Sequence, residues 1–189
     1  MSFETISDLL AVGRADAPAL LAPDRPELTY DRLRTHIAEL ATQLAAFGVG
    51  RGDRVAIALG NGPEMALSFL AAATCATAAP LNPKYRQDEF AFYFEDTRAT
   101  TLIVPPEGME AARAAATPDM VVLTASPRED GTMQLTLERG QRAPQSLTPP
   151  SPEDVALILH TSGTTSRPKR VPLRQRLQRR GVDLGAESL

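Results

Sequence analysis

Short apolar runs alternate with longer helical patterns along most of this chain. Four runs of strand character can be recognised, and they are Val55–Leu59, Thr101–Val104, Met120–Leu123 and Val155–Leu159. Parallel neighbouring strands need a long crossover connection, which a helix usually provides, so this alternation favours a parallel sheet. We therefore predict an α/β fold, in which helices flank a partial parallel sheet and the crossovers are right-handed.

Helix signals lie in the segments before and between these runs. The segments expected to be helical are Ile6–Val12, 30–47, Glu64–Thr77, Gln87–Asp96 and Gly108–Ala116. In the second of these, Thr29 is placed as the N-cap and Gly48 as the residue that ends the helix. His36 lies next to the apolar stripe of this helix. No second metal-ligand type accompanies it, so we expect an ordinary surface or boundary histidine.

Turn signals divide the second half of the chain. Asp130-Gly131 is a turn sequence, and the run Met133–Leu137 after it predicts an edge strand. Residues 140–152 contain prolines 144, 149, 150 and 152, so we expect an extended linker on the surface of the domain. This linker would deliver the chain to the strand that begins at Val155.

A loop dense in hydroxyl groups follows the last apolar run. It holds five hydroxyl residues, one glycine and two cations: Thr161, Ser162, Gly163, Thr164, Thr165, Ser166, Arg167 and Lys169. Short hydroxyls and free backbone N–H groups can converge on phosphate oxygens, glycine allows close approach, and lysine supplies a mobile positive charge. The pattern indicates a polyphosphate-binding loop. The plainer alternative is a Ser/Thr-rich turn with no ligand.

This loop differs from a Walker A motif. That motif places glycine before its lysine and Ser or Thr after it, and it opens a helix. Here Pro168 precedes Lys169 and Arg170 follows it, while Pro172 discourages a helix directly afterwards.

The segment Thr161-Ser162-Gly163-Thr164-Thr165-x-x-Pro168-Lys169-x-Val171 resembles the phosphate-loop signature of adenylate-forming enzymes, which include acyl-CoA synthetases, luciferases and peptide-synthetase adenylation domains. His160 before the loop and Ser166-Arg167 inside it are most similar to the oxalate–CoA ligase branch. Upstream, Leu28-Thr29-Tyr30 and Gly52-Asp53-Arg54-Val55-Ala56 resemble the opening of the same family. The stretch from Ala76 to Tyr93 again resembles the oxalate–CoA ligase branch.

The resemblance implies an ATP-dependent, AMP-forming acid–CoA ligase and the N-terminal portion of the family's large domain. Such enzymes join a carboxylate to AMP with release of pyrophosphate, then pass the acyl group to the thiol of coenzyme A. ATP, Mg²⁺ and coenzyme A are therefore the implied cofactors, and oxalate or a fatty acid is a candidate substrate. Six residues would bind the phosphates, namely Thr161, Ser162, Gly163, Thr164, Thr165 and Lys169. No complete catalytic set and no Mg²⁺ ligand is expected in this chain. The alternative is a non-catalytic nucleotide-binding or interaction module.

Arg170 departs from the family pattern, which usually has glycine after the lysine. If that position needs a positive φ angle, an arginine would be strained there. A bulky side chain could also crowd the triphosphate. We therefore expect glycine to serve better than arginine at this position.

The family pattern extends from Leu28 through Leu173, and an arginine-rich segment, 174–189, follows it. This segment is interpreted as a solvated helix end, as residues read in a non-native frame or, least favoured because aromatics are lacking, as a nucleic-acid patch. Relatives continue into the metal-binding acidic residue, the ribose-binding aspartate and a small domain with a catalytic lysine. Residues 1–173 are thus expected to form the first part of a longer ligase, inactive alone, with apolar faces and a strand edge exposed.

Composition excludes several other classes. A net charge of −3 and a pI near 5.5 give no reason to expect nucleic acid or an anionic membrane as a partner. Cys75 is the single cysteine, so neither an intrachain disulfide nor a cysteine metal cluster can form, and its alanine-rich surroundings predict a buried, inert thiol. No signal peptide or bilayer-length apolar run is recognised, so a cytoplasmic location is expected. The oligomeric state stays open.

Overall fold

The computed structural model describes residues 4–161 and 168–176. Its main sheet is formed by the strands β3 Arg54–Ile57, β4 Thr77–Pro80, β5 Thr101–Val104, β6 Val121–Pro127, β7 Met133–Arg139, β8 Val155–Thr161 and β9 Lys169–Arg174. Their spatial order is β7-β6-β5-β3-β4-β8-β9. The five inner strands run parallel, and β7 and β9 are antiparallel to their neighbours at the two edges. The predicted α/β fold with a mostly parallel sheet is confirmed.

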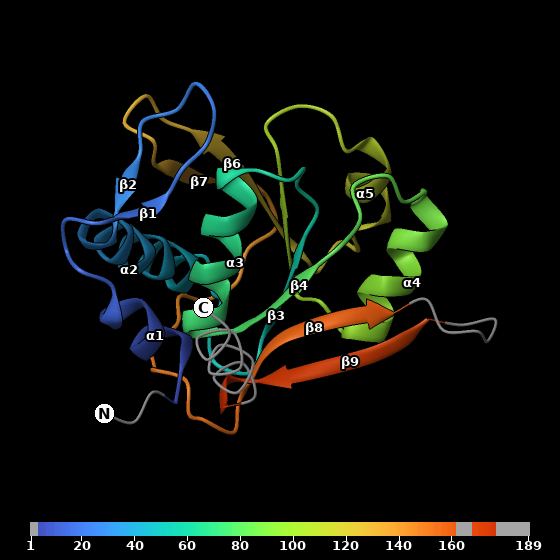
Figure 1. Cartoon of the computed structure of the whole chain (residues 1–189). Helices are drawn as coiled ribbons and strands as arrows, with labels where there is room; N and C mark the ends of the chain where they lie inside the picture. Colours follow the sequence, from blue (N-terminus) through green and yellow to red (C-terminus); the bar gives the residue numbers. More distant parts are fainter. Residues whose placement is uncertain (1–3, 162–167, 177–189) are drawn as a thin grey trace.

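Helices cover both faces of this sheet (Figure 1). The helices are α1 Ile6–Val12, α2 Tyr30–Ala46, α3 Pro63–Cys75, α4 Gln87–Thr97 and α5 Glu110–Ala115. One core forms between the sheet and α1, α2 and α3, and a second between the sheet and α4 and α5. Strand β3 shows why two cores exist. Side chains alternate along a strand, so Val55 and Ile57 enter the first core while Ala56 enters the second.

A small antiparallel sheet, β1 Pro18–Leu20 with β2 Leu28–Thr29, precedes α2. The predicted limits of α2 are confirmed by its local geometry. The Thr29 hydroxyl oxygen accepts from the Arg32 backbone N–H at 3.3 Å. After the helix, Gly48 has φ +84°, and a Cβ there would lie 2.4 Å from the Cβ of Arg142. Glycine is therefore required both by the turn and by the chain that packs over it.

Two strands of the main sheet, like the short strands β1 and β2, were not expected from the sequence. The segment Thr77–Pro80 contains two alanines and ends in proline, and neither residue favours strands, yet it forms β4 in the centre of the sheet. Residues Lys169–Arg174 form β9 although they include Pro172. Strand β9 lies at the edge of the sheet, where one side of its backbone forms no hydrogen bonds with another strand. Proline has no backbone N–H to donate, so edge strands tolerate it.

The prediction for His36 was wrong, because this side chain is fully buried. Its Nε2 accepts a hydrogen bond from the backbone N–H of Met133 at 3.1 Å, and its Nδ1 lies 3.1 Å from Glu39 Oε2. The imidazole therefore satisfies a buried backbone donor at the start of β7.

Cys75 is buried as predicted. Burial, together with the nearby charge of Asp53, raises the pKa of its thiol to about 12, so the reactive thiolate is scarce at neutral pH.

Residues 140–150 adopt no helix or strand and pass over the end of α2 and the start of β3. The backbone N–H of Gln145 donates to the carbonyl of Ala45 at 2.8 Å, and Arg142 pairs with Asp53 at 3.0 Å. The proline-rich linker is thus attached to the domain. Within the described ranges, the chain has no helix that is both long and apolar enough to cross a membrane.

Candidate functional site

The candidate loop connects the two strands of an antiparallel hairpin. Strands β8 and β9 are paired from Val155 with Arg174 up to Thr161 with Lys169. Thr161 and Lys169 are both exposed and form the last pair before the loop. Ser162, Gly163, Thr164 and Thr165 lie outside the described residues. The structure therefore places two of the six predicted phosphate-binding residues, and these two face each other at the entrance of the loop.

The hairpin entrance lies at the carboxyl end of β8, one of the parallel strands. Strand β8 runs parallel to β4, with Leu157 opposite Ala78. Figure 1 shows β8 ending at the thin grey trace of the loop and β9 returning from it. In open α/β sheets, ligands bind outside the carboxyl ends of the strands. The loop thus follows the carboxyl end of a parallel strand, the kind of position at which this class of fold binds ligands.

The side chain just before the loop is anchored to α4. His160 is almost fully buried, with 4% of its side chain exposed, and its Nε2 lies 3.0 Å from Oδ2 of Asp96. Its ring contacts the ring of Tyr93 edge-on, with 4.5 Å between the centroids. Because a carboxylate only accepts hydrogen bonds, the imidazole Nε2–H donates to Asp96. His160 thus fastens the end of β8 to the last turn of α4.

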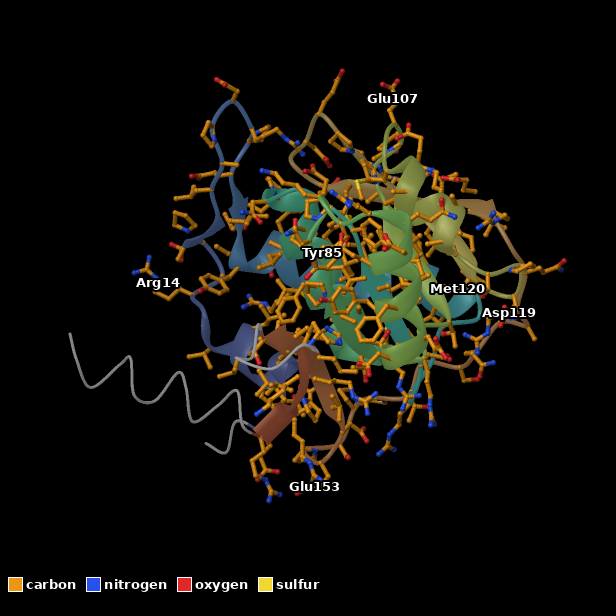
Figure 2. The ribbon with its side chains drawn as sticks, turned by 90° about the vertical axis from the view of Figure 1, so that its right-hand side faces the viewer. Arg14, Tyr85, Glu107, Asp119, Met120 and Glu153 are labelled. Carbon is orange, nitrogen blue, oxygen red and sulfur yellow. The ribbon has the colours of Figure 1, made fainter. Side chains whose placement is uncertain are left out.

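Tyr93 is buried and also contacts Tyr85, which is half-buried. It stacks on Tyr85 at a centroid distance of 4.7 Å and an interplanar angle of 17°. Figure 2 shows Tyr85 among the crowded side chains at the centre of the view, whereas Arg14 and Glu107 project at the periphery. Burial, and next a hydrogen bond with Tyr85, raise the pKa of the Tyr93 hydroxyl to about 12. The hydroxyl therefore stays protonated at neutral pH.

Arg170 shows none of the backbone strain that the sequence suggested. It lies within β9, opposite His160, and the described non-glycine residues with positive φ are Asp24, Arg98 and Met109. The expectation of strain was therefore wrong, because the chain after Lys169 is an extended strand. The Arg170 guanidinium donates to the backbone carbonyl of Asp96, and its Nε lies 4.0 Å from Asp96 Oδ2.

The opposite end of the hairpin is also attached to the domain. Gln175 is buried, with its side-chain oxygen accepting from the N–H of Ile6 at 2.9 Å and its amide nitrogen donating to the carbonyl of Ala73 at 2.8 Å. Arg174 and Arg176 pair with Glu153 at 2.7 and 2.8 Å. These pairs are about half exposed and contribute little, so the buried Gln175 is the stronger attachment.

A cavity of about 380 Å³ lies between the hairpin, the end of α4 and the starts of β3 and β4, and its lining includes four arginines: Arg51, Arg54, Arg98 and Arg170. The C-terminal ends of α3 and α4 also border it. Helix C-termini carry partial negative charge, which nearby guanidinium groups complement. The arginines thus have a local electrostatic role beside these helix ends, so their presence does not by itself indicate an anion site.

A wider cavity of about 730 Å³ lies at the carboxyl ends of β3 and β4. Its walls come from the loop Leu59–Gly62, from Met65 and Phe69 of α3, and from the segment Pro80–Lys84. The residues that line it include none of the described hairpin residues 155–161 and 169–174. No group of three or more His, Cys, Asp or Glu side chains that could hold a metal ion occurs among residues 4–161 and 168–176.

Sequence reasoning missed Asp96 and Tyr93 as parts of this site. They precede the loop by more than sixty positions and belong to a helix that is rich in aromatic residues. No motif or spacing links them to the loop. Only the arrangement of α4 against β8 brings the two regions together.

The chain is similar in sequence to known proteins. Residues 10–179 match the family model described as AMP-binding enzyme. The probable CoA ligase CCL9 of Humulus lupulus is 44% identical over 181 residues, which are 90% of this chain and 34% of that protein. The oxalate–CoA ligase of Arabidopsis thaliana is 38% identical over 184 residues, which are 93% of this chain and 36% of that protein.

The fold is also shared with solved structures. The crystal structure of apo MatB from Rhodopseudomonas palustris matches with a TM-score of 0.69 and 23% identity, over 92% of this chain and 35% of that one. The chain thus spans about a third of the length of the curated relatives that it matches.

Proposed function

This chain belongs to the AMP-binding enzyme family, and we propose that it supplies the polyphosphate-binding part of an ATP-dependent, AMP-forming acid–CoA ligase. The observation that carries this proposal is the pair Thr161 and Lys169. They are exposed and lie opposite each other at the entrance of the hydroxyl-rich loop, at the carboxyl end of the parallel strand β8. A hydroxyl and an ammonium group in this position suit the oxygens of a polyphosphate.

The proposed contacts follow from the chemistry of the residues. Thr161, Ser162, Thr164 and Thr165 offer hydroxyl or backbone N–H donors, Gly163 permits close approach, and Lys169 brings positive charge. Negative charge moves onto the pyrophosphate as it leaves ATP. Donors positioned in advance stabilise that charge at little reorganisation cost. The loop would thereby lower the barrier to formation of the acyl-adenylate.

Residues of this chain can be assigned to one of the three implied cofactors. The loop entrance suits the phosphates of ATP. Mg²⁺ is expected to accompany ATP, but the described residues offer no cluster of protein ligands, so we assign no step to a metal held by this chain. Coenzyme A is proposed as the acyl acceptor, and none of the residues described above is assigned to bind it.

Oxalate is the first carboxylate to test, because the Arabidopsis relative, 38% identical to this chain, is an oxalate–CoA ligase. A fatty acid is the alternative. We further propose that residues 1–173 form the family domain and that 174–189 are an atypical tail, of which the family match covers only 174–179. A cytoplasmic location remains a prediction.

We propose that the 189 residues alone bind polyphosphate but do not catalyse adenylation. They span about a third of the curated relatives, and adenylation must position the metal, the ribose and the acid together. A phosphate loop supplies only part of that arrangement.

Isothermal titration calorimetry of this chain with ATP and with pyrophosphate tests the proposal. We expect weak, saturable binding of both ligands that is reduced by added salt, since charge contributes to it. Absence of binding to either ligand would contradict the phosphate-binding role. A parallel assay of oxalate-dependent exchange between ATP and labelled pyrophosphate should show no activity, and exchange by the chain alone would contradict the non-catalytic part of the proposal.

A further inference from the structure

The residue pair directly behind the loop entrance is held by one side chain of α4. Behind Thr161 and Lys169, the next cross-strand pair is His160 with Arg170, and both side chains reach Asp96. We propose that Asp96 is a positioning residue for the phosphate loop, because it fixes both strands of the hairpin where the loop begins. This inference rests on the proposed function of the loop.

The contact on β8 is buried and directional. His160 has 4% of its side chain exposed, and its Nε2 lies 3.0 Å from Asp96 Oδ2. The ring of Tyr93, one turn earlier on α4, closes one side of the imidazole at 4.5 Å. A buried N–H must have an acceptor, so His160 keeps its orientation only while Asp96 provides one.

On β9, Arg170 contacts both the backbone carbonyl and the side chain of Asp96. The Arg170 guanidinium donates to the Asp96 carbonyl, and its Nε lies 4.0 Å from the Asp96 carboxylate. Carbonyls in the last turn of a helix have no partner within the helix, so Arg170 also satisfies a free acceptor of α4. An arginine in place of the family's glycine thus gives this hairpin a second attachment to the same point.

Helix α4 is rigid enough to act as the reference for both strands. Phe90 and Phe94 are buried in the second core, and Tyr93 stacks on Tyr85. At its end, the Thr97 hydroxyl donates to the carbonyl of Tyr93 at 2.6 Å. Asp96 therefore has a fixed position relative to the sheet, and its contacts with His160 and Arg170 fix the position of the hairpin.

The stability of α4 itself does not account for Asp96. This residue is next to last in the helix, where the partial negative charge of the C-terminus disfavours a carboxylate. Glu95 beside it has the same disadvantage but is exposed and has no hydrogen bond or ion pair to the described residues of the hairpin. The partners of Asp96 that offset this cost lie on β8 and β9, which points to a role in the hairpin.

Amide hydrogen exchange by NMR on this chain tests the proposal without a ligand. We expect Asp96→Ala to accelerate exchange at the Thr161 and Lys169 amides by about tenfold relative to the parent. Exchange in β3 and β5, at Val55 and Leu102, should stay as in the parent. Asp96→Asn keeps an oxygen acceptor for His160 and should fall between the two. Glu95→Ala removes the neighbouring carboxylate and should have no effect, which makes it the matched control.

The functional readout is titration of the same four proteins with pyrophosphate. Asp96→Ala should weaken the affinity several-fold, Asp96→Asn should partly restore it, and Glu95→Ala should match the parent. Unchanged exchange at the entrance, or equal acceleration throughout the sheet, would overturn the proposal and leave Asp96 a merely structural residue. If the parent itself fails to bind pyrophosphate, the proposed function fails, while the exchange rates still decide whether Asp96 fixes the hairpin. If Asp96→Ala does not fold, Asp96→Asn and Glu95→Ala provide the comparison.

Discussion

Thr161 and Lys169 lie opposite each other as the last residue pair of the β8–β9 hairpin, and both side chains are exposed. The hydroxyl-rich loop therefore begins and ends at one point, the carboxyl end of β8. Either residue can be changed without creating a cavity in the core. Effects on ligand binding at this pair can thus be separated from effects on folding.

Lys169→Ala should weaken pyrophosphate binding by about tenfold, the low end of what a charge-assisted hydrogen bond contributes, because the site is open to solvent. The midpoint of thermal unfolding should not change. The measurement is calorimetric titration of the folded variant. Arg128→Ala removes an exposed cation beside the β6–β7 hairpin and serves as the control for net charge. Equal loss of affinity in both variants would show that only overall charge matters.

Arg170→Gly should destabilise the protein by about 1–2 kcal/mol, contrary to the expectation from the sequence alone. Glycine weakens a strand through backbone entropy, and the hydrogen bond to the Asp96 carbonyl is lost. Denaturant unfolding measures the change, and Arg170→Lys, which keeps the charge, should cost less. A glycine variant that is more stable or binds pyrophosphate more tightly would restore the idea of strain at this position.

His36→Leu should cost about 1–3 kcal/mol of unfolding free energy, because the buried N–H of Met133 loses its acceptor. The volume of the side chain changes little, so the loss would come mainly from the hydrogen bond. Glu39→Gln is the control. Its side chain is half exposed, and replacing the carboxylate beside His36 Nδ1 with an amide should be nearly neutral. A stable His36→Leu protein would mean that water or a backbone shift satisfies Met133.

Tyr93→Phe should reduce the loss of stability at alkaline pH. The pKa of Tyr93 rises from 10.0 to about 12 in the folded chain, so the folded state holds this proton more tightly than the unfolded state. The corresponding stability is complete below pH 10 and is lost as the pH rises toward 12. Unfolding free energies at about pH 8 and about pH 11 should converge in the variant more than in the parent. An equal decline in both proteins would contradict this pKa.

Much of the fold could be predicted because local signals and tertiary packing agree. Thr29 and Gly48 mark the limits of α2, and the runs at β3, β5 and β8 are apolar enough to identify as buried strands. Strand β4 gave no such signal. Its alanines are small and favour helices, and only pairing with β3 and β8 makes this segment a strand. Pro172 likewise concealed β9, since an edge position cannot be recognised from neighbouring residues.

In the candidate site, too, features set by the local sequence could be predicted, and features set by tertiary contacts could not. The loop residues are contiguous, so their chemistry can be recognised from the sequence. Asp96 could not be recognised, because its importance depends on the distance of 3.0 Å to His160, a residue sixty-four positions away. The strain expected at Arg170 was wrong for a related reason. The conformation of that residue depends on its pairing with His160 rather than on the sequence around it.

The central claim, that the loop between Thr161 and Lys169 binds polyphosphate, is tested most directly by following the backbone amides of this chain in an NMR titration with pyrophosphate. We predict saturable chemical-shift changes concentrated between residues 160 and 170, with smaller changes at Asp96 and none at the β6–β7 turn around Asp130. Shifts that cluster elsewhere, such as at the arginine-lined cavity around Arg51 and Arg98, or no shifts at millimolar pyrophosphate, would contradict the account.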